Sequence, residues 1–245
     1  KFSLFEDKNV LRKAVRMRRS VLDFQPKDIS KKQFVSCLAS ILPACNPILA
    51  EHCKNFLGDG TGRNFPHIHF GMWITGVQGM KNGRYFLLRN QDCGDDLLRV
   101  QHKMAQGENT SELVKVPGLP EEINLFYCEG IGSGEVSEFK KEASGNSCHQ
   151  KIAEDCSVVI AMLSPVGEAI GLEARNYAYM HWEAGFLGQL LYVQAYQQGL
   201  GATGMGCFLD EETAAAFAVG PDYTPIYHFA FGVMVKDHRF SSVEQ

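Results

Sequence analysis

The sequence predicts an α+β fold in which helices flank a mostly antiparallel central sheet. Helix-forming and strand-forming stretches are intermixed along the chain, and neither internal repeats nor a convincing linker divides it. The chain has 245 residues, 45% of them hydrophobic, which is enough for one sizeable core or for a core and a dimer interface. We therefore expect a single domain over residues 1–245, standing alone or as part of a longer chain.

The first quarter of the chain favours helices. Residues 8–17 predict a helix that leads into an Arg-Arg-Ser turn, and the loop-rich residues 43–64 hold another short helix over 48–56. Ser30–Leu42 predicts a further helix, because Ser30 can cap its N-terminus and apolar residues share one face. The residues on that face are Phe34, Cys37, Leu38 and Ile41.

Strands are predicted in the middle and at the end of the chain. Ile68–Val77 and Arg84–Arg89 should pair as a hairpin across Lys81-Asn82-Gly83, since Asn-Gly is the strongest short-range hairpin signal. Further strands are predicted at residues 122–127, 158–164 and 224–235. The stretch 128–147 is polar and rich in glycine, and we expect a mobile loop or lid there. Its glycines do not form a dinucleotide fingerprint, because no apolar helix follows them.

The stretch Tyr179–Asp210 is the most informative part of the sequence. It predicts a long helix, a glycine-dense turn and a short extended segment. One helix face carries small residues that leave room for another backbone, and an apolar stripe follows helical spacing. The small residues are Ala184, Gly185 and Gly188, and the stripe is Leu187, Leu190, Leu191 and Ala195. We expect Gly199 and Gly201 to end the helix.

The turn after this helix suits a flat ligand. Gly204 and Gly206 leave the backbone N–H groups around Met205, Gly206 and Cys207 free to face it. A buried helix that runs into such a turn fits a planar cofactor. A packed helix followed by its C-cap is the alternative interpretation.

Charge and hydropathy argue against nucleic acid and membrane as partners. The net charge is −4, and the basic segment Arg12–Arg19 lacks interleaved aromatic residues and a wider basic surface. No apolar run approaches the roughly 20 residues that cross a bilayer. We expect an intracellular, cytoplasmic protein. Because the chain begins at Lys1, a targeting segment or a preceding domain stays open as an alternative.

The cysteines and histidines do not indicate a cross-link or a metal. Eight cysteines are scattered without a C-x-x-C pair, so free thiols in a reducing compartment are expected. Cys207 is expected to fill space near the cofactor. His67 and His69 share one strand face but lack a third ligand at useful spacing, so no metal site is predicted. A serine hydrolase is not predicted either, since no G-x-S-x-G elbow exists.

Several motifs, in order and spacing, resemble the nitroreductase-like FMN flavoproteins, and among them the SagB-type dehydrogenases. Members open with R-R-S-x-x-x-F and later carry an E-A-G-x-x-x-Q helix that runs into G-L-G-x-x-x-x-G-x-F. The matching residues are Arg18-Arg19-Ser20 with Phe24, Glu183-Ala184-Gly185 with Gln189, and Gly199-Leu200-Gly201 with Gly206 and Phe208. The resemblance implies the nitroreductase fold and a homodimer that binds FMN at the subunit interface.

The resemblance also implies roles for individual residues. Arg18 and Ser20, with Arg19 beside them, would bind the FMN phosphate, which suits a guanidinium fork and a hydroxyl donor. Lys236 and Arg239 follow the last strand, where basic residues complete the phosphate site in relatives. A backbone N–H in the segment Gly204, Met205, Gly206 and Cys207 would donate to flavin N5.

Departures from the family pattern affect the flavin ring. Leu22 stands where relatives often carry a basic residue, so Arg63, Asn64 or Arg175 would have to substitute, or flavin binding would be altered. Of these, Asn64 is counted among the cofactor-binding residues. Arg175 and Tyr177 match the family's R-x-Y and are the predicted catalytic pair, because a phenol needs a neighbour to move a proton near neutral pH. Simple packing of Tyr177 is the alternative.

The function implied is that of an FMN-dependent oxidoreductase with two-electron transfer through flavin N5. SagB-type dehydrogenation of azoline-like rings in a small-molecule or peptide substrate is the first expectation. Reduction of nitro compounds or quinones with NAD(P)H as electron donor is the alternative. A hypothesis of another class is a flavin-free scaffold or partner subunit.

Overall fold

The fold is built around one antiparallel sheet, and it is described here from a computed structural model. The structure describes residues 7–56, 68–89, 112–130, 134–219 and 223–236, without the side chains of residues 52–56. The strands are β1 (His69–Ile74), β2 (Gly83–Leu88), β3 (Glu112–Lys115), β4 (Asn124–Glu129), β5 (Val158–Ser164), β6 (Gly201–Met205) and β7 (Thr224–Gly232). They lie in the order β3-β4-β2-β1-β5-β7-β6, so β3 and β6 form the two edges.

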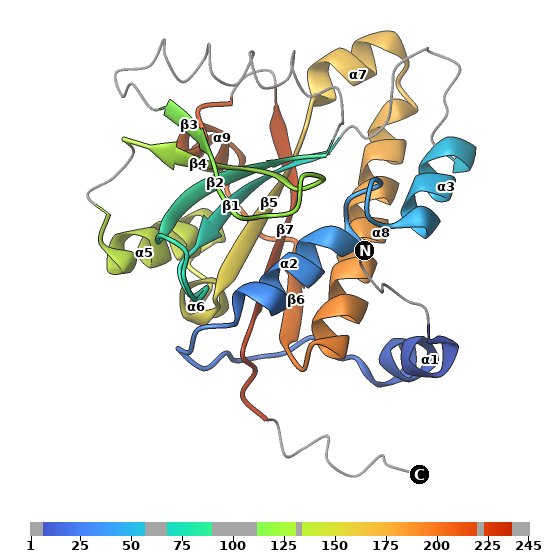
Figure 1. The fold of residues 1–245 in the computed structure, drawn as a ribbon. Helices are drawn as coiled ribbons and strands as arrows, with labels where there is room; N and C mark the ends of the chain where they lie inside the picture. Colours follow the sequence, from blue (N-terminus) through green and yellow to red (C-terminus); the bar gives the residue numbers. More distant parts are fainter. Residues whose placement is uncertain (1–6, 57–67, 90–111, 131–133, 220–222, 237–245) are drawn as a thin grey trace.

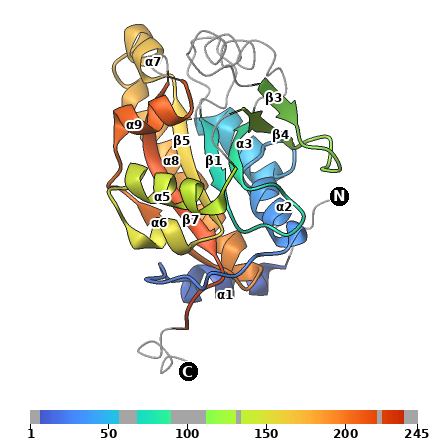
Figure 2. The ribbon, with the colours of Figure 1, turned by 90° about the vertical axis from the view of Figure 1, so that its left-hand side faces the viewer.

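Helices cover both faces of this sheet (Figures 1 and 2). They are α1 (Lys8–Met17), α2 (Lys31–Ser40), α3 (Pro47–Phe56), α5 (Val136–Asn146), α6 (Lys151–Asp155), α7 (Val166–Leu172), α8 (Asn176–Gln197) and α9 (Asp210–Ala216). In Figure 2 α5, α6 and α9 lie in front of the sheet, while α2 and α8 lie behind it. This arrangement confirms the predicted α+β class with its flanked antiparallel sheet.

Each face of the sheet contributes to its own hydrophobic core, because successive strand residues point to opposite sides. In β1, Met72 packs into the core under α2 and α8, whereas Trp73 packs into the core under α5 and α9. All residues of β1 and β5 are buried, as expected for strands covered on both faces. Among the described helices, none has the length and apolar character needed to cross a membrane.

Local sequence signals predicted several elements well. The helix predicted from Ser30 begins at Lys31, and its capping box is complete: Gln33 N–H donates to Ser30 Oγ, and the Gln33 side chain accepts from Ser30 N–H. The predicted helices around 8–17 and 48–56 are also confirmed. The predicted hairpin pairs as expected, with Gly83 as the first residue of β2 and Asn82 directly before it.

The expected loop or lid within residues 128–147 is wrong for most of that stretch. Val136–Asn146 forms α5, whose Phe139 and Ala143 are buried four residues apart on one face. Glu142 accepts hydrogen bonds from Trp73 Nε1 at 2.9 Å and from Arg84 Nε at 2.8 Å, which holds the helix against β1 and β2. The sequence interpretation gave too much weight to the glycines and charges around this short apolar pair.

Candidate functional site

The candidate site lies at the β6 edge of the sheet, where the Arg-Arg-Ser segment runs alongside the strand in space. Ser20 forms a parallel bridge with Ala202 of β6, and Val21 N–H donates to Ala202 O at 3.0 Å. Thr203 Oγ1 adds a hydrogen bond to Val21 O at 3.2 Å. The first motif and the glycine turn are far apart in sequence, and the fold places them side by side.

Tyr192 of α8 joins these two motifs. Its hydroxyl lies 2.7 Å from Ser20 Oγ and accepts the Gly204 N–H at 2.7 Å. The Arg18 guanidinium lies over the ring of Tyr192, 4.6 Å from its centroid. Sequence reasoning missed Tyr192. The available signal was a tyrosine one helical turn after Gly188, on the same face of the helix.

Arg18 presents an unpaired polar atom at this site. Its Nε is buried and has no hydrogen-bond partner among the described residues. By contrast, Arg19 is exposed and donates from Nη1 to the backbone oxygens of Arg16, at 3.0 Å, and Arg18, at 2.9 Å. A buried N–H of a permanently charged group is costly without an acceptor. Arg18 therefore suits an anionic ligand better than Arg19 does.

Tyr227 of β7 occupies a slot between two glycines. A Cβ on Gly204 would lie 1.7 Å from the Tyr227 hydroxyl oxygen, and a Cβ on Gly188 would lie 3.0 Å from its Cε1. The small residues of α8 were predicted to leave room for another backbone. At Gly188 the space is instead filled by the ring of Tyr227. A Cβ on Gly185 would meet nothing within 4 Å. Burial raises the pKa of Tyr227, and Tyr192 adds to the rise while Arg18 opposes it.

At the end of β6 a buried residue, Met205, is followed by an exposed one, Gly206. Met205 is buried in the core under α5 and α9. Gly206 is exposed, and a Cβ there would meet nothing within 4 Å, so its surroundings have space for a ligand. Gly199, at φ +71°, ends α8 as predicted, whereas Gly201 begins β6 rather than ending the helix.

Cys207 forms a disulfide with Cys148, so the expectation of free thiols is wrong for this pair. The two Cα atoms lie 5.9 Å apart, across a sequence separation of 59 residues. Cys207 is exposed, which also contradicts its expected role as an apolar filler. No local pattern marks this cross-link, because the cysteines meet only where the segment after α5 contacts the segment after β6 in the folded chain.

A buried histidine lies next to the disulfide. His228 of β7 is fully buried, and its Nδ1 is 3.0 Å from Ser147 Oγ. Its ring stacks on Phe208 at a centroid distance of 4.6 Å and an interplanar angle of 15°. Burial lowers the pKa of His228 to about 3, which keeps the imidazole neutral at ordinary pH.

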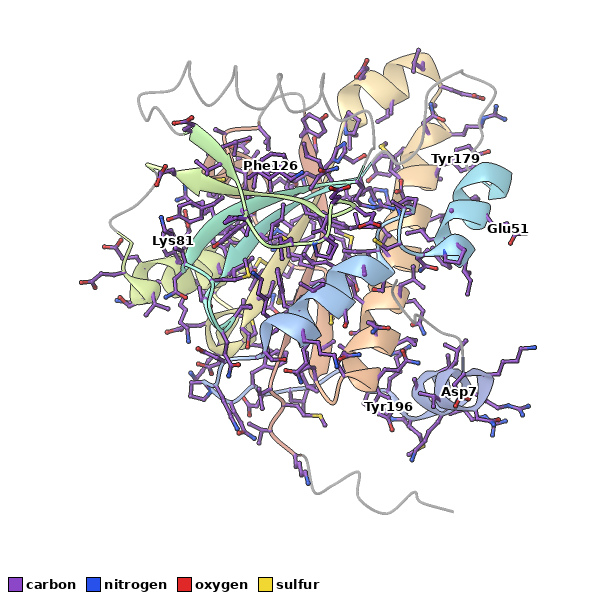
Figure 3. All side chains as sticks on the ribbon, in the orientation of Figure 1. Asp7, Glu51, Lys81, Phe126, Tyr179 and Tyr196 are labelled. Atoms are coloured by element: carbon purple, nitrogen blue, oxygen red, sulfur yellow. A yellow bond between two sulfur atoms is a disulfide. The ribbon has the colours of Figure 1, made fainter. Side chains whose placement is uncertain are left out.

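Arg175 and Tyr177 lie at the opposite end of α8 from Tyr192. Helical rise separates Tyr177 from Tyr192 by about 22 Å. Figure 3 shows this geometry, with Tyr179 at one end of the helix and Tyr196 beside α1 at the other. Arg175 pairs with Glu173 at 2.6 Å, and the half-exposed Tyr177 ring lies 4.4 Å from that of His181. One chain does not bring this pair to the glycine turn.

Other residues singled out in the sequence have structural roles or lie outside the described part. Glu183 of the E-A-G motif forms a buried ion pair with Arg89. Lys236 is exposed after β7, next to Val235, whose N–H donates to Asp23 O at 3.1 Å. The described residues hold no cluster of three or more metal-ligating side chains. Arg63, Asn64, His67 and Arg239 lie outside the described residues.

The protein thus has an α+β fold whose β6 edge carries Arg18, with a buried and unpaired Nε, and an exposed glycine turn at Gly206. The family model for the nitroreductase family matches residues 15–233. The chain belongs to the nitroreductase family. No curated protein sequence matches it.

Solved structures share the fold. One described as a "putative nitroreductase" from Anabaena variabilis has a TM-score of 0.64 at 20% identity, over 92% of this chain and 38% of that chain. The "hypothetical oxidoreductase YcnD" from Bacillus subtilis has a TM-score of 0.52 at 11% identity, over 93% and 67% of the respective chains. NfrA2 from B. megaterium has a TM-score of 0.51 at 10% identity, over 93% and 68%. The chain thus spans well under half of the length of the Anabaena structure.

Proposed function

We propose that the protein is an FMN-dependent oxidoreductase whose flavin lies along the β6 edge. The observation that carries this proposal is the buried, unpartnered Nε of Arg18, next to a turn whose Gly206 faces open space. The first feature calls for an anion and the second admits a flat group. Tyr192 connects the two, because its hydroxyl contacts Ser20 and Gly204. A ligand with a phosphate at one end and a flat ring at the other would satisfy both features.

Different residues would bind the phosphate and the ring of FMN. Arg18 would hold the phosphate through charge-assisted hydrogen bonds, with Ser20 as a hydroxyl donor and Lys236 as a second positive charge. The exposed backbone at Gly206 and Cys207 would donate to the ring. Bound FMN supplies two-electron chemistry at N5, which no side chain can supply. Because the proposed donor to the flavin ring is a backbone N–H, this position needs a glycine that leaves space rather than a special side chain.

The predicted pair Arg175 and Tyr177 would serve this site only from a second copy of the chain. Within one chain, Tyr177 lies about 22 Å from Tyr192, too far for both to touch one flavin ring. In a homodimer with the flavin between subunits, Tyr177 of one copy could reach the ring bound by the other. There the phenol would exchange a proton with substrate, with Arg175 two residues before it in the chain.

For the substrate we propose an azoline-like ring that is dehydrogenated, as in the SagB-type branch. The motifs around Glu183-Ala184-Gly185 and Gly199-Leu200-Gly201 support this proposal. Reduction of a nitro compound or quinone with NAD(P)H is the alternative. Anaerobic mixing with NADPH separates them: rapid bleaching of the flavin followed by reoxidation with a quinone would favour the reductase.

The first experiment is the visible absorption spectrum of the purified, dialysed protein, with identification of any released chromophore. A flavin spectrum that yields FMN near one per chain supports the proposal. A colourless protein that also fails to take up added FMN would refute it and favour the flavin-free scaffold.

Arg18→Ala then tests the phosphate clamp. Loss of a charged hydrogen-bonding partner should weaken FMN binding by about 1.5–3 kcal/mol. Arg16→Ala is the matched control, because Arg16 is an exposed basic residue of the same segment. Equal FMN affinity in both variants would overturn the assignment of Arg18.

A further inference from the structure

The Cys148–Cys207 disulfide is more accessible to solvent than three of the four free cysteines in the described part of the chain; the fourth, Cys45, is half-buried like Cys148. Cys37, Cys128 and Cys156 are buried, and burial raises the pKa of each thiol to about 12. Such thiols are poor nucleophiles, because the reactive form is the thiolate. Cys207, in contrast, is exposed, and Cys148 is half-buried. A reagent in solution can therefore reach this cross-link.

The backbone at the disulfide has an uncommon conformation. Cys148 and His149 have φ values of +54° and +57°, in the left-handed region that non-glycine residues rarely adopt. Residues keep such a conformation where their surroundings hold it. Here His149 N–H donates to Ser144 O at 2.8 Å, and α5 and α6 flank the segment on both sides. The segment thus presents Cys148 in a fixed position.

His228 links the same two segments without a covalent bond. It contacts Ser147 through Nδ1 and stacks on Phe208. These two residues are the immediate chain neighbours of Cys148 and Cys207. His228 is fully buried, so water does not compete for its contact with Ser147.

Two further hydrogen bonds span the same gap. Gln150 Nε2 donates to Cys207 O at 3.0 Å, and Leu209 N–H donates to Asn146 O at 2.9 Å. Together with His228, these bonds hold the segments in register when the S–S bond is broken. The two thiols then stay close enough to close again.

We propose that Cys148–Cys207 is a thiol–disulfide exchange site for a dithiol reductant and that its redox state controls the turn at Gly206. A thiolate of the reductant attacks Sγ of the exposed Cys207, the S–S bond breaks, and Cys148 leaves as a thiolate that takes up a proton. The second thiol of the reductant then attacks the mixed disulfide and releases Cys207. The chain gains two electrons and two protons, and the reductant leaves as its own disulfide.

The consequence for the flavin rests on the function proposed above. The N–H groups proposed for the flavin ring belong to the segment that the disulfide fixes. Reduction leaves this segment with hydrogen bonds and the Phe208 stack alone, so part of its preorganisation is lost. FMN binding should therefore weaken when the pair is reduced.

The exchange is tested on the folded protein, independently of FMN. The protein is equilibrated with mixtures of reduced and oxidised dithiothreitol, alkylated, and analysed by peptide mass spectrometry. Cys148 and Cys207 should become alkylated together, while Cys37, Cys128 and Cys156 stay protected. Transfer into oxidised dithiothreitol, which accepts the two electrons, should restore the same pair. Resistance to reduction until urea unfolds the chain, or reoxidation to other pairings, would overturn the exchange site.

A variant tests the role of the noncovalent link. Phe208→Ala removes the ring stack beside Cys207 but leaves both cysteines and the Ser147 contact. Reoxidation of the pair should slow in this variant, while the unfolding temperature measured in the reduced state shows whether the fold persists. An unchanged reoxidation rate in a folded variant would refute the role given to His228 and Phe208.

FMN affinity tests the coupling. The dissociation constant, measured by quenching of flavin fluorescence, should rise about three- to tenfold in the reduced protein and in Cys148→Ser. Cys45→Ser is the control, since Cys45 lies outside this cross-link. Equal affinity in both redox states refutes the coupling. Failure of both states to bind FMN refutes the proposed function and the coupling with it, whereas the exchange site stands on its own result.

Discussion

Replacing Gly204 with alanine should disturb the site by a steric route that the structure specifies. The new methyl group would lie 1.7 Å from Oη and 2.6 Å from Cζ of Tyr227. The ring cannot simply retreat toward α8, because Gly188 already lies close on that side. Neither Gly204 nor Gly206 has a positive φ, so backbone strain does not enter the comparison.

The expected change in the free energy of unfolding is the cost of overpacking at Gly204, compared with a control variant at Gly206. Inserting a methyl group into an occupied space costs about 1–3 kcal/mol. Gly206→Ala is the matched control, because its methyl group would meet nothing within 4 Å. This control should leave the free energy of unfolding unchanged or raise it by about 0.4–1 kcal/mol through the unfolded chain. We therefore expect Gly204→Ala to be less stable than Gly206→Ala by about 2 kcal/mol.

Urea unfolding followed by far-ultraviolet circular dichroism measures both free energies of unfolding. A double-mutant cycle with Tyr227→Leu then attributes the effect, since removal of the ring should relieve most of the clash. The reasoning is refuted if Gly204→Ala is as stable as Gly206→Ala, or if its loss is the same with leucine at position 227.

Further predictions concern buried polar groups. The pKa of His228 is about 3 in the folded protein against an ordinary 6.5, so the unfolded chain binds more protons between these values. Its contribution is complete above pH 6.5 and declines as the pH falls, by about 2 kcal/mol at pH 5, and urea titrations should show a weaker pH dependence in His228→Asn. Glu183→Gln should cost about 3–5 kcal/mol by leaving Arg89 buried without its counter-charge, and Arg89→Met with Glu183→Leu should recover much of this loss. Tyr192→Phe should lower the free energy of unfolding by about 1–2 kcal/mol, because it removes the hydroxyl that accepts the Gly204 N–H; an unchanged urea midpoint would contradict this role.

The sequence by itself determined features whose signals lie within a few residues. Ser30 and Gln33 specify a capping box, and Gly199 specifies the end of α8 by its left-handed conformation. The Asn82-Gly83 signal indicated the hairpin of β1 and β2 in the central sheet. The Arg-Arg-Ser and glycine motifs together indicated the family. The helix α5 was missed because its local signal, Phe139 with Ala143, is short and surrounded by charges.

Only the tertiary structure decided how these parts combine. Ser20 meets Tyr192 across 172 residues, and Cys148 meets Cys207 across 59. The structure also separated Tyr177 from the glycine turn, although both belong to one continuous stretch of sequence. The physical reason is that capping and turn preferences act between neighbours in the chain, whereas a hydrogen bond, a ring slot or a disulfide depends on which faces of helix and sheet pack together.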